Sequence, residues 1–451
     1  MTTDRDLLVI GGGAAGLAAA DAAASAGLRV ALLEAGPAVG GLARAVQIGG
    51  EPVEAYYHHI FPQDRETLDL AGRLALGPDV EWRPASMGIL HDSRVYPFNG
   101  PPDLLRFRPL SLPSRVRVGL ATAVQLIRRD QLRLDRTPVD VESRRWYGSA
   151  AYQLLWQPLL EAKFGDLHRQ LPMAWLVARL RQRAAGRRVD GDRLGYLNGS
   201  LRRLLVSYAA LLERDGVDVV TNALNRTDFD GDSAVRRLRR VDDAWQADVD
   251  VNGEAQRFTG RAVVAAVSGE ILQRMTTVSP EYAEAIAAIP YRSVVCVLLE
   301  MTESISPHYW VNVTDRLGLG CVAIIEHTRF VPRERYAGRH VLYLAHYVDR
   351  DSPTWRASVD DMVGAVEPAF RALNPAYQRA WIVDAHVARD LYAQPVPQVG
   401  GPMPGLSIRT GVPGLLHASL AHIYPDDRGI SLALRLGQRA GTAAVAHLAR
   451  R

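Results

Sequence analysis

The sequence predicts an α/β protein in which a Rossmann-like domain is interrupted by an inserted α+β domain. Two observations predict this fold. The chain begins with an apolar strand, a glycine-rich turn, an alanine-rich helix and a second strand, the order that opens a Rossmann-like domain. Further along, a helical stretch and then strand-like alternation precede an apolar helix near the end of the chain. The 451 residues are enough for two domains.

Composition excludes several classes of function. Lys and Arg total 53 against 49 for Asp and Glu, and this small basic excess does not indicate a nucleic-acid binder. Cys296 and Cys321 are too few for a disulfide framework or a thiolate metal site, so we expect no metal and a reducing compartment. Asp4 and Asp6 stand where a secretory leader would carry positive charge, which favours a cytoplasmic protein.

The first forty-four residues contain the strongest motif. Residues 6–10 are predicted to form a buried strand, residues 14–26 an alanine-rich helix, and residues 29–33 a second strand. A Gly-x-Gly-x-x-Gly turn joins the first strand to the helix. This is the dinucleotide-binding fingerprint in the strand, turn, helix and strand context that it requires.

The three glycines of this fingerprint and the acid that follows it each have a physical role. Gly11 allows a tight turn, Gly13 lets the backbone approach a pyrophosphate, and Gly16 lets the helix pack closely on the sheet. The free N–H groups at the start of the helix attract the anion. Glu34 lies 18 residues beyond Gly16 and is expected to accept hydrogen bonds from an adenosine ribose. The neighbouring residues expected to contact the cofactor are Ala14, Ala15 and Ala35.

The segment after Glu34 indicates which dinucleotide is bound. It reads Ala-Gly-Pro-Ala-Val-Gly-Gly-Leu-Ala-Arg. This segment resembles the double-glycine segment of the flavoprotein superfamily that contains protoporphyrinogen oxidase, the amine oxidases, phytoene desaturase and UDP-galactopyranose mutase. The resemblance implies a glutathione-reductase-type FAD-binding domain, in which this loop covers the pyrophosphate and the ribityl chain of FAD. The residues that it implies as FAD contacts are Gly40, Gly41, Leu42, Ala43 and Arg44.

Two later segments extend the resemblance. Residues 216–224 look like the family's strand whose final apolar residue, here Leu224, lies against the adenine side of FAD. Residues 414–429 lead into an apolar helix at about residues 430–448 and look like the closing family motif, which brings N–H groups to the flavin pyrimidine edge. The usual Gly-Asp of that motif is absent, and Asp426 or Asp427 could replace its acid. The implied contacts are Asp427, Arg428, Gly429 and Ile430.

These motifs divide the chain into five segments. We expect the FAD-binding domain to contain residues 1–95, 196–270 and 401–451. A helical substrate or cap region is expected at residues 96–195, and a substrate domain with a second sheet at residues 271–400.

Residues 114–129 are predicted to form a helix in an Arg-rich stretch. Val116, Leu120, Val124 and Ile127 fall on one face of it. We expect this face to pack against the core. The alternative is contact with a membrane surface, as in related monotopic flavoenzymes, which would add peripheral membrane association to a cytoplasmic location.

A histidine pair follows the double-glycine loop. The segment at residues 55–64 is similar to the His-Ile-Phe segment of the mutase family, which runs past the flavin ring. His58 or His59 is therefore a candidate proton carrier or orienting donor. The alternative is that the pair only closes a turn.

Lys163 is the single lysine among 53 basic residues. In many amine oxidases a lysine holds a water near flavin N5, and the position that aligns with it here is Cys296. Lys163 could replace that lysine from another element, because an ammonium group titrates and Arg does not. Arg179 and Arg183 stand one helical turn apart and could bind a phosphate or carboxylate, unless they form a solvated helix face.

The second sheet supplies further candidates for the substrate pocket. Its predicted strands include residues 293–299 and 340–347. Aromatic and titratable side chains on or beside it, and one in the closing segment, are expected to line the pocket. These candidates are Tyr309, Trp310, Glu326, Tyr347 and Tyr424.

A single dinucleotide fingerprint restricts the route of the electrons. The pair Gly318-x-Gly320 lacks a third glycine, so a second domain for NAD(P)H is not expected. Electrons would then come from a small-molecule substrate and leave to O2 or another acceptor. We predict an FAD-dependent oxidase or dehydrogenase that removes a hydride from a C–H bond of a small or lipid-like substrate. The alternative is a redox-neutral sugar-nucleotide mutase that resembles UDP-galactopyranose mutase.

Overall fold

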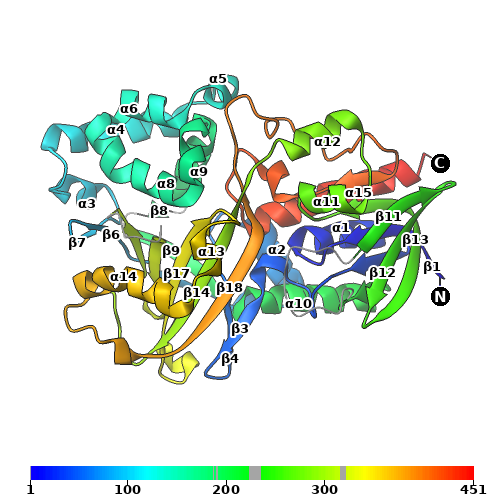
Figure 1. The fold of residues 1–451 in the computed structure, drawn as a ribbon, viewed down its shortest axis with the longest axis horizontal. Helices are drawn as coiled ribbons and strands as arrows, with labels where there is room; N and C mark the ends of the chain where they lie inside the picture. Colours follow the sequence, from blue (N-terminus) through cyan, green and yellow to red (C-terminus); the bar gives the residue numbers. More distant parts are fainter. Residues whose placement is uncertain (1, 186, 189–190, 223–234, 315–320, 451) are drawn as a thin grey trace.

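The computed structural model describes residues 2–185, 187–188, 191–222, 235–314 and 321–450. Two seven-stranded sheets lie side by side, with a group of helices over the second sheet (Figure 1). Both termini lie at the outer end of the first sheet. The predicted α/β class is confirmed by this arrangement.

The first sheet is the Rossmann-like part of the molecule. Its order is β10, β2, β1, β13, β12 and β11, with β19 also paired to β13. The strands from β10 to β13, and β19, are parallel, so their carboxyl ends meet at one edge, where ligands bind in such sheets. The strands are β1 (Thr2–Ile10), β2 (Val30–Leu33), β10 (Asp218–Val220), β11 (Val235–Val241), β12 (Ala244–Val251), β13 (Glu254–Ala265) and β19 (Leu415–His417).

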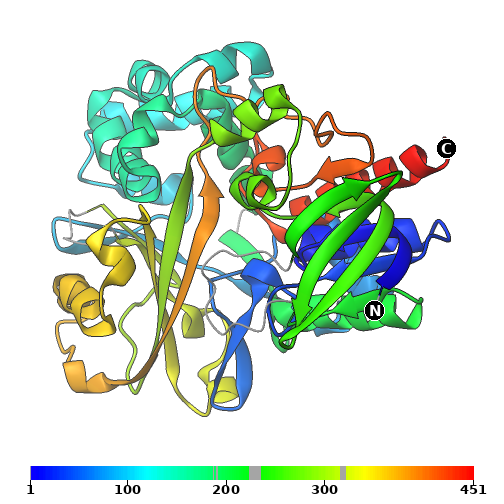
Figure 2. The same cartoon turned by 45° about the vertical axis from the view of Figure 1, so that its right-hand side comes forward.

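Helices cover both faces of this sheet. Four of them share one apolar core with β1 and β2: α1 (Ala14–Ala24), α2 (Arg65–Arg73), α10 (Ser200–Arg214) and α15 (Ile430–Leu448). On the other face α11 (Gly269–Met275) and α12 (Pro280–Ala287) pack near β11 and β12 (Figure 2).

Helices α1 and α15 run in the same direction and touch through their backbones. A Cβ atom on Gly437 would lie 2.0 Å from the carbonyl oxygen of Ala15, and one on Gly441 would lie 2.5 Å from that of Ala19. Only glycine allows this approach. The N-termini of both helices therefore point to the same side of the sheet.

The second sheet has one face toward the first domain and one face covered by helices. Its order is β18, β14, β17, β16, β15, β6 and β7. An aromatic-rich core occupies the inner face, and α14 packs on the outer face. The elements are β6 (Met87–His91), β7 (Arg94–Pro97), β14 (Tyr291–Met301), β15 (Trp310–Val313), β16 (Cys321–Glu326), β17 (His340–Val348), β18 (Ile382–Pro395), α13 (Pro353–Arg356) and α14 (Val359–Leu373).

The helices over the second sheet form a cap. They are α3 (Pro101–Arg106), α4 (Leu112–Ile127), α5 (Gln131–Arg136), α6 (Val139–Tyr147), α7 (Ser149–Ala151), α8 (Gln157–Phe164) and α9 (Met173–Ala185), with a π-helical turn at Tyr152–Trp156. The smaller strands are β3 (Ala45–Ile48), β4 (Glu51–Glu54), β5 (Val80–Pro84), β8 (Arg187–Arg188) and β9 (Gly191–Leu197). The 3₁₀ helices are Gly41–Ala43, Gly77–Asp79, Gly165–Gln170, His327–Arg329, Arg333–Tyr336, Arg379–Trp381 and Leu420–Ile423.

Most predicted elements are present, with shifted ends. The fingerprint helix ends at Ala24 rather than at residue 26, and the closing helix has the predicted bounds. The strand predicted to end at Leu224 ends at Val220, and Leu224 lies outside the described residues. β18 was not predicted, because this edge strand carries charged and polar residues along much of its length. The five-segment division into domains stays a proposal.

The prediction for α4 is wrong in one respect. Val116, Leu120 and Ile127 were expected to face the core, but their exposed fractions are 46%, 66% and 75%. The face that packs on the neighbouring helices instead carries the buried residues Val118, Ala121 and Gln125. Among the described residues, no helix is both long enough and apolar enough to cross a membrane.

Candidate active site

A cavity of about 400 Å³ lies between the carboxyl edge of the first sheet and the inner face of the second. One end is formed by the glycine turn after β1 and the start of α1. The other end is formed by aromatic and charged side chains from the cap and the second sheet. The predicted cofactor contacts that line the cavity are Gly11, Gly13, Ala14, Ala15, Glu34, Ala35, Gly40, Gly41, Leu42, Ala43, Arg44, Asp427, Arg428, Gly429 and Ile430.

The glycine turn is held by backbone contacts. Gly11 has φ +101°, and a Cβ there would lie 2.7 Å from the carbonyl oxygen of Ala266. Gly16 lies behind the turn, where a Cβ would lie 1.8 Å from the carbonyl oxygen of Gly11. A Cβ on Gly13 would meet nothing within 4 Å, so this position is open to the cavity. Gly13 caps α1 without a side-chain hydrogen bond, which leaves backbone N–H groups available to an anion.

Glu34 stands at the end of β2, next to the turn. It is buried, and its two carboxylate oxygens accept hydrogen bonds from the backbone N–H groups of Gly12 at 2.6 Å and Gly36 at 2.7 Å. Burial raises the pKa of this carboxyl group, and the two backbone hydrogen bonds oppose the rise. The carboxylate is thus fixed in place and keeps acceptor capacity for ribose hydroxyls.

The double-glycine loop is tied to the fingerprint. The backbone N–H of Gly40 donates to the carbonyl oxygen of Gly12 at 3.0 Å, and Gly40 has φ +135°. Arg44 points from this loop to the second domain, where its guanidinium donates to the hydroxyl of Tyr56 at 2.6 Å and lies 3.5 Å from Asp390. The loop therefore joins the two halves of the cavity.

The closing segment brings a second helix N-terminus to the cavity. α15 begins at Ile430 after Gly429, which makes no side-chain cap. Asp426 is exposed and does not line the cavity, whereas Asp427 is buried and lines it. Among the residues that the structure describes, the Oδ1 atom of Asp427 has no hydrogen-bond partner. A buried unpaired carboxylate oxygen is costly, so a ligand hydroxyl is the expected partner.

These features together suit FAD. Two helix N-termini can bind phosphate oxygens and the flavin pyrimidine edge, Glu34 can bind the ribose, and Asp427 can accept a ribityl hydroxyl. The glycine turn leaves open space that a Cβ would otherwise fill.

His58 and His59 border the cavity from the segment after β4. Nδ1 of His58 lies 2.6 Å from the carbonyl oxygen of Tyr56, so it is the protonated nitrogen and Nε2 is the acceptor. Burial lowers the pKa of His58 to about 4. Burial, together with Arg183 and Arg179, lowers the pKa of His59. Both rings are neutral at pH 7.

Lys163 reaches the cavity from α8. Its Nζ lies 2.8 Å from Oδ2 of Asp427, and Arg179 of α9 lies 3.5 Å from the same oxygen. Burial lowers the pKa of Lys163 to about 8, with Arg179 and Arg428 adding to the effect and Asp427 opposing it. Burial raises the pKa of Asp427, but the cations lower it more, so it stays ionised.

Cys296, which aligns with the amine oxidase lysine, lies in the core of the second sheet and does not line the cavity. Burial raises the pKa of its thiol. Lys163 is therefore the lysine available to the cavity.

The remaining sequence candidates line the cavity, lie just behind its wall, or lie away from it. Arg179, Trp310 and Tyr347 line the cavity. Arg183 and Tyr309 lie just behind the wall: the guanidinium of Arg183 lies over the rings of Phe61 and Trp310, and the hydroxyl of Tyr309 lies 3.2 Å from Nδ1 of His59.

Glu326 and Tyr424 are not cavity residues, which corrects their prediction as substrate contacts. The Glu326 carboxylate accepts from the backbone N–H groups of Ile305 and Ser306 and so stabilises that loop. Tyr424 donates to Asp135 in the cap at 2.5 Å and lies beside a separate small pocket.

Several cavity residues were not predicted. Tyr57 is one of them: its hydroxyl lies 3.4 Å from that of Tyr347, which was predicted and which accepts a hydrogen bond from the predicted Arg428. Asp390, which faces Arg44, belongs to the unpredicted strand β18. The two tyrosines beside the histidine pair were a usable signal, whereas nothing in the sequence marks Asp390.

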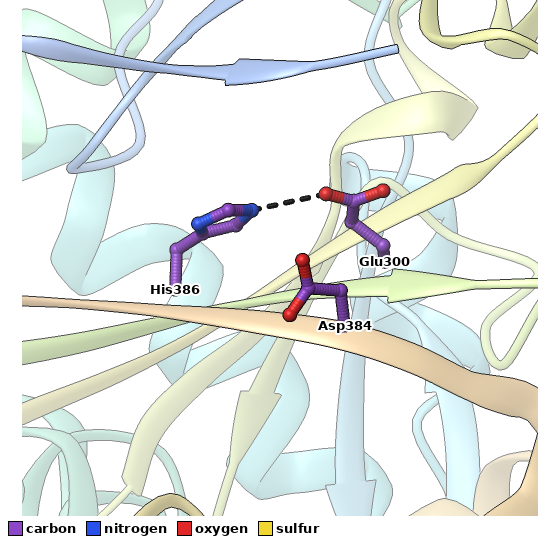
Figure 3. A group of neighbouring side chains, drawn as sticks. All are labelled: Glu300, Asp384 and His386. Carbon is purple, nitrogen blue, oxygen red and sulfur yellow. Dashed lines mark hydrogen bonds and ion pairs between the residues drawn. The ribbon is translucent and has the colours of Figure 1, made fainter.

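A second polar cluster lies at the far end of β14 and β18 (Figure 3). Ligand atoms of Glu300, Asp384 and His386 lie within 4.8 Å of one another, and Nε2 of His386 is 3.0 Å from Glu300. Asp384 is exposed, and the hydrogen bond to Glu300 already satisfies Nε2 of His386. The cluster is outside the cavity and is explained as a hydrogen-bonded group near the surface.

Comparison with known proteins matches this chain to a family of flavoproteins. The sequence pattern of the family described as flavin containing amine oxidoreductase matches residues 14–425. Hydroxyneurosporene desaturase from Rhodobacter capsulatus is 56% identical over 54 residues, which are 12% of this chain and 11% of that protein. The matched part is thus about a tenth of the desaturase.

Solved structures match over the whole chain. A protein from Exiguobacterium sp. 255-15, provisionally named a protoporphyrinogen oxidase, has a TM-score of 0.74 at 18% identity and covers 100% of this chain and 99% of its own. Cyclohexylamine oxidase from Brevibacterium oxydans has a TM-score of 0.72 at 17% identity and covers 99% of this chain and 100% of its own. At these identities the likeness concerns the fold.

Proposed function

The chain belongs to the family of flavin-containing amine oxidoreductases, and we propose that it is an FAD-dependent oxidoreductase acting on a C–H or C–N bond of a small organic substrate. The predicted flavoprotein superfamily and FAD cofactor are confirmed by this membership. The mutase alternative is not favoured, because the matching family is one of flavin-containing amine oxidoreductases and the similar proteins described above are oxidases and a desaturase.

One observation carries the proposal. A single cavity joins the glycine turn and Glu34 at one end to Lys163 and His58 at the other. When bound, FAD supplies a hydride acceptor that later passes its electrons to O2 or another acceptor. The two helix N-termini and Glu34 would hold it, and Asp427 would accept a hydrogen bond from a hydroxyl of its ribityl chain.

The catalytic work of the chain is assigned to residues at the cap end. His58 accepts at Nε2 the proton that the substrate loses as its carbon gives up a hydride. Lys163, held by Asp427, keeps a proton at Nζ and orients a polar group of the substrate. His59, held by Tyr309, and the ring of Trp310 form the wall against which the substrate packs.

The similar proteins do not decide the substrate. One is named for the oxidation of cyclohexylamine and another for the desaturation of hydroxyneurosporene, and their likeness to this chain is limited to the fold or to a short stretch. The choice depends on the side chains at the cap end.

The test is peroxide formation by the purified, flavin-loaded protein with amines, alcohols, fatty acids and polyprenyl compounds. We expect peroxide, or reduction of an added acceptor such as a quinone, with one of these classes. Rearrangement of a UDP-sugar by the dithionite-reduced protein, without net oxidation, would contradict the proposal. H58Q should lower the rate about 10²-fold or more while flavin content stays normal.

Peripheral membrane contact is proposed on separate evidence, an exposed apolar surface of the cap. The described residues include ten large apolar side chains that are exposed, and seven of these ten lie between residues 105 and 141. Six of them, on α3, α4 and α5, form what we name the α4 patch: Leu105, Leu112, Val116, Leu120, Ile127 and Leu132.

The charges around the α4 patch favour an anionic lipid surface as its partner. Between residues 101 and 136 one acid, Asp130, is exposed. The exposed basic residues there are Arg106, Arg108, Arg117, Arg129, Arg133 and Arg136. Arginines beside an apolar stripe bind anionic headgroups, whereas two copies of the patch would repel each other.

Vesicle sedimentation tests this contact. The protein should pellet with phosphatidylglycerol vesicles and not with phosphatidylcholine vesicles, and 0.5 M salt should weaken the binding. L120E/I127E should abolish it, and V383E, which places one such charge on an exposed valine outside the patch, should not. No pelleting, or concentration-dependent dimers that L120E/I127E removes, would contradict the proposal.

A further inference from the structure

Four charged side chains from three parts of the chain meet at the cap end of the cavity. They are Lys163 of α8, Arg179 of α9, and Asp427 and Arg428 before α15. The side chain of Lys163 is 14% exposed and that of Asp427 is 5% exposed. Three cations and one carboxylate therefore share a largely enclosed wall.

The single carboxylate does not balance this cluster. Lys163 and Arg179 both lie at ion-pair distance from Oδ2 of Asp427. Within the part of the chain that the structure describes, no further acid lies at ion-pair distance from these two cations. Arg428 donates to neutral oxygens, the hydroxyl of Tyr347 and the carbonyl of Ala393. The cluster keeps a net charge of about two positive units, which is unfavourable in a low-dielectric wall.

The other acids of the cavity wall have partners elsewhere. Glu34 is bound to two backbone N–H groups at the glycine end. Asp64 accepts from the backbone N–H of Phe61 at 2.8 Å. Asp390 faces Arg44. The phosphates of FAD are assigned to the start of α1, so they leave the cluster unbalanced as well.

We propose that Lys163, Arg179 and Arg428 form a binding site for an anionic group of the substrate, a carboxylate or a phosphate. This inference rests on the proposed function and names the substrate class of the same cavity. Arginine and lysine bind such groups by charge-assisted hydrogen bonds, and the guanidinium fork matches both groups. Phe61 and Trp310 border the adjacent wall and suit an apolar or aromatic substrate body.

A site for an anion distinguishes this protein from oxidases of aliphatic amines. An ammonium substrate would meet three cations at the cap end, and its charge would be repelled. A neutral substrate would leave the cluster unbalanced. An anion is the ligand that lowers the electrostatic energy of the site.

Calorimetric titration of the flavin-loaded wild type with four matched probes tests the site. The probes are decanoate, decyl phosphate, decylamine and decanol, which share one apolar tail. We expect one of the two anions to bind at least about tenfold more tightly than the amine and the alcohol. The stronger of the two anions identifies the group that the site takes. Equal binding of all four, or tighter binding of decylamine, would overturn the proposal.

A variant pair locates the binding to the cluster. R179Q should lose about tenfold in anion affinity and keep its affinity for decanol. R145Q removes an exposed arginine of the cap outside the cavity and should bind as the wild type does. Unchanged anion binding by R179Q would overturn the assignment, and the wild-type probe series remains decisive if R179Q does not fold.

The absorbance spectrum of the titrated protein keeps the two proposals apart. A flavin-loaded protein that prefers the amine contradicts the anion site and leaves the oxidoreductase assignment intact. A protein that cannot be loaded with flavin contradicts the oxidoreductase assignment itself.

Discussion

The two ends of the cavity are built in different ways. The glycine end is made of backbone: a turn, the uncapped N-terminus of α1 and a carboxylate fixed by backbone N–H groups. The cap end is made of side chains that come from distant segments. Lys163 and Asp427, for example, meet across 264 positions of sequence.

Because the two ends are built differently, substitutions at each end affect different properties of the protein. A site made of backbone contacts depends on steric fit, so a single Cβ can destroy it. A site made of side chains tolerates substitution without loss of the fold, and its chemistry changes residue by residue. The glycine end therefore sets the cofactor, and the cap end sets the reaction and the substrate.

The largest effect is expected from breaking the glycine end at Gly16. G16A places a Cβ at 1.8 Å from the carbonyl oxygen of Gly11, so α1 cannot keep its place on the sheet. We expect the variant to bind no flavin and to give a much lower yield of soluble protein than the wild type. G72A in α2, where a Cβ meets nothing within 4 Å, is the control and should be neutral or stabilising. Flavin content per protein measures both, and a flavin-loaded G16A would contradict the packing.

The next largest effect is expected at the cap end, from substitution of Lys163. K163M should lower kcat/KM by about 10²-fold or more while flavin content stays normal. The pKa of Lys163 near 8 means that its ammonium form dominates below that pH, so wild-type kcat/KM should fall as pH rises above it. K163R keeps its charge and should move this fall to higher pH. An unchanged pH profile in K163R would assign the fall to another group.

A smaller effect is expected from Glu34 at the glycine end. E34Q keeps the shape but replaces one acceptor oxygen with an amide donor, which opposes the N–H of Gly12 or Gly36. FAD affinity should fall about tenfold, with kcat nearly unchanged once the protein is saturated with FAD. Equilibrium dialysis against FAD measures the change. A large loss of kcat in the saturated protein would mean that the two ends are not separable.

The smallest effect on the cavity is expected from Glu54, which lies at neither end. It is fully buried and accepts from Tyr196 at 3.0 Å and from the backbone N–H of Leu201 at 2.6 Å. Burial raises its pKa from 4.5 to about 7. The unfolded chain ionises first as pH rises, so the stability from this group is present below pH 4.5 and is lost toward pH 7.

E54Q cannot ionise and should lack that pH dependence. Melting temperatures at pH 5 and pH 8 should differ less in E54Q than in the wild type, and flavin content should be equal in both. An identical pH dependence in the two proteins would show that Glu54 does not cause it.

The same comparison explains what could be predicted from the sequence. Gly11, Gly13, Gly16 and Glu34 follow one another at fixed spacings, because adjacent backbone segments build that end. The helix that begins at Ile430 was predicted from its apolar run and from the resemblance of the preceding segment to a family motif.

The cap end could be predicted only in part. Lys163 stood out by composition, but its meeting with Asp427 depends on how three segments pack. Asp390 belongs to an edge strand without an apolar pattern. The periodicity of α4 located an apolar face and could not tell which side the core lies on, so Leu120 was assigned to the wrong side.

The absorbance spectrum of the purified protein, followed without oxygen while substrates are added and then in air, tests the central claim most directly. We expect oxidised flavin bands near ~450 nm, bleaching by an anionic substrate, and recovery with air or an added acceptor. A protein that neither contains nor takes up flavin would contradict the account at the glycine end. A flavin that only dithionite bleaches, followed by rearrangement of a sugar nucleotide, would contradict it at the cap end.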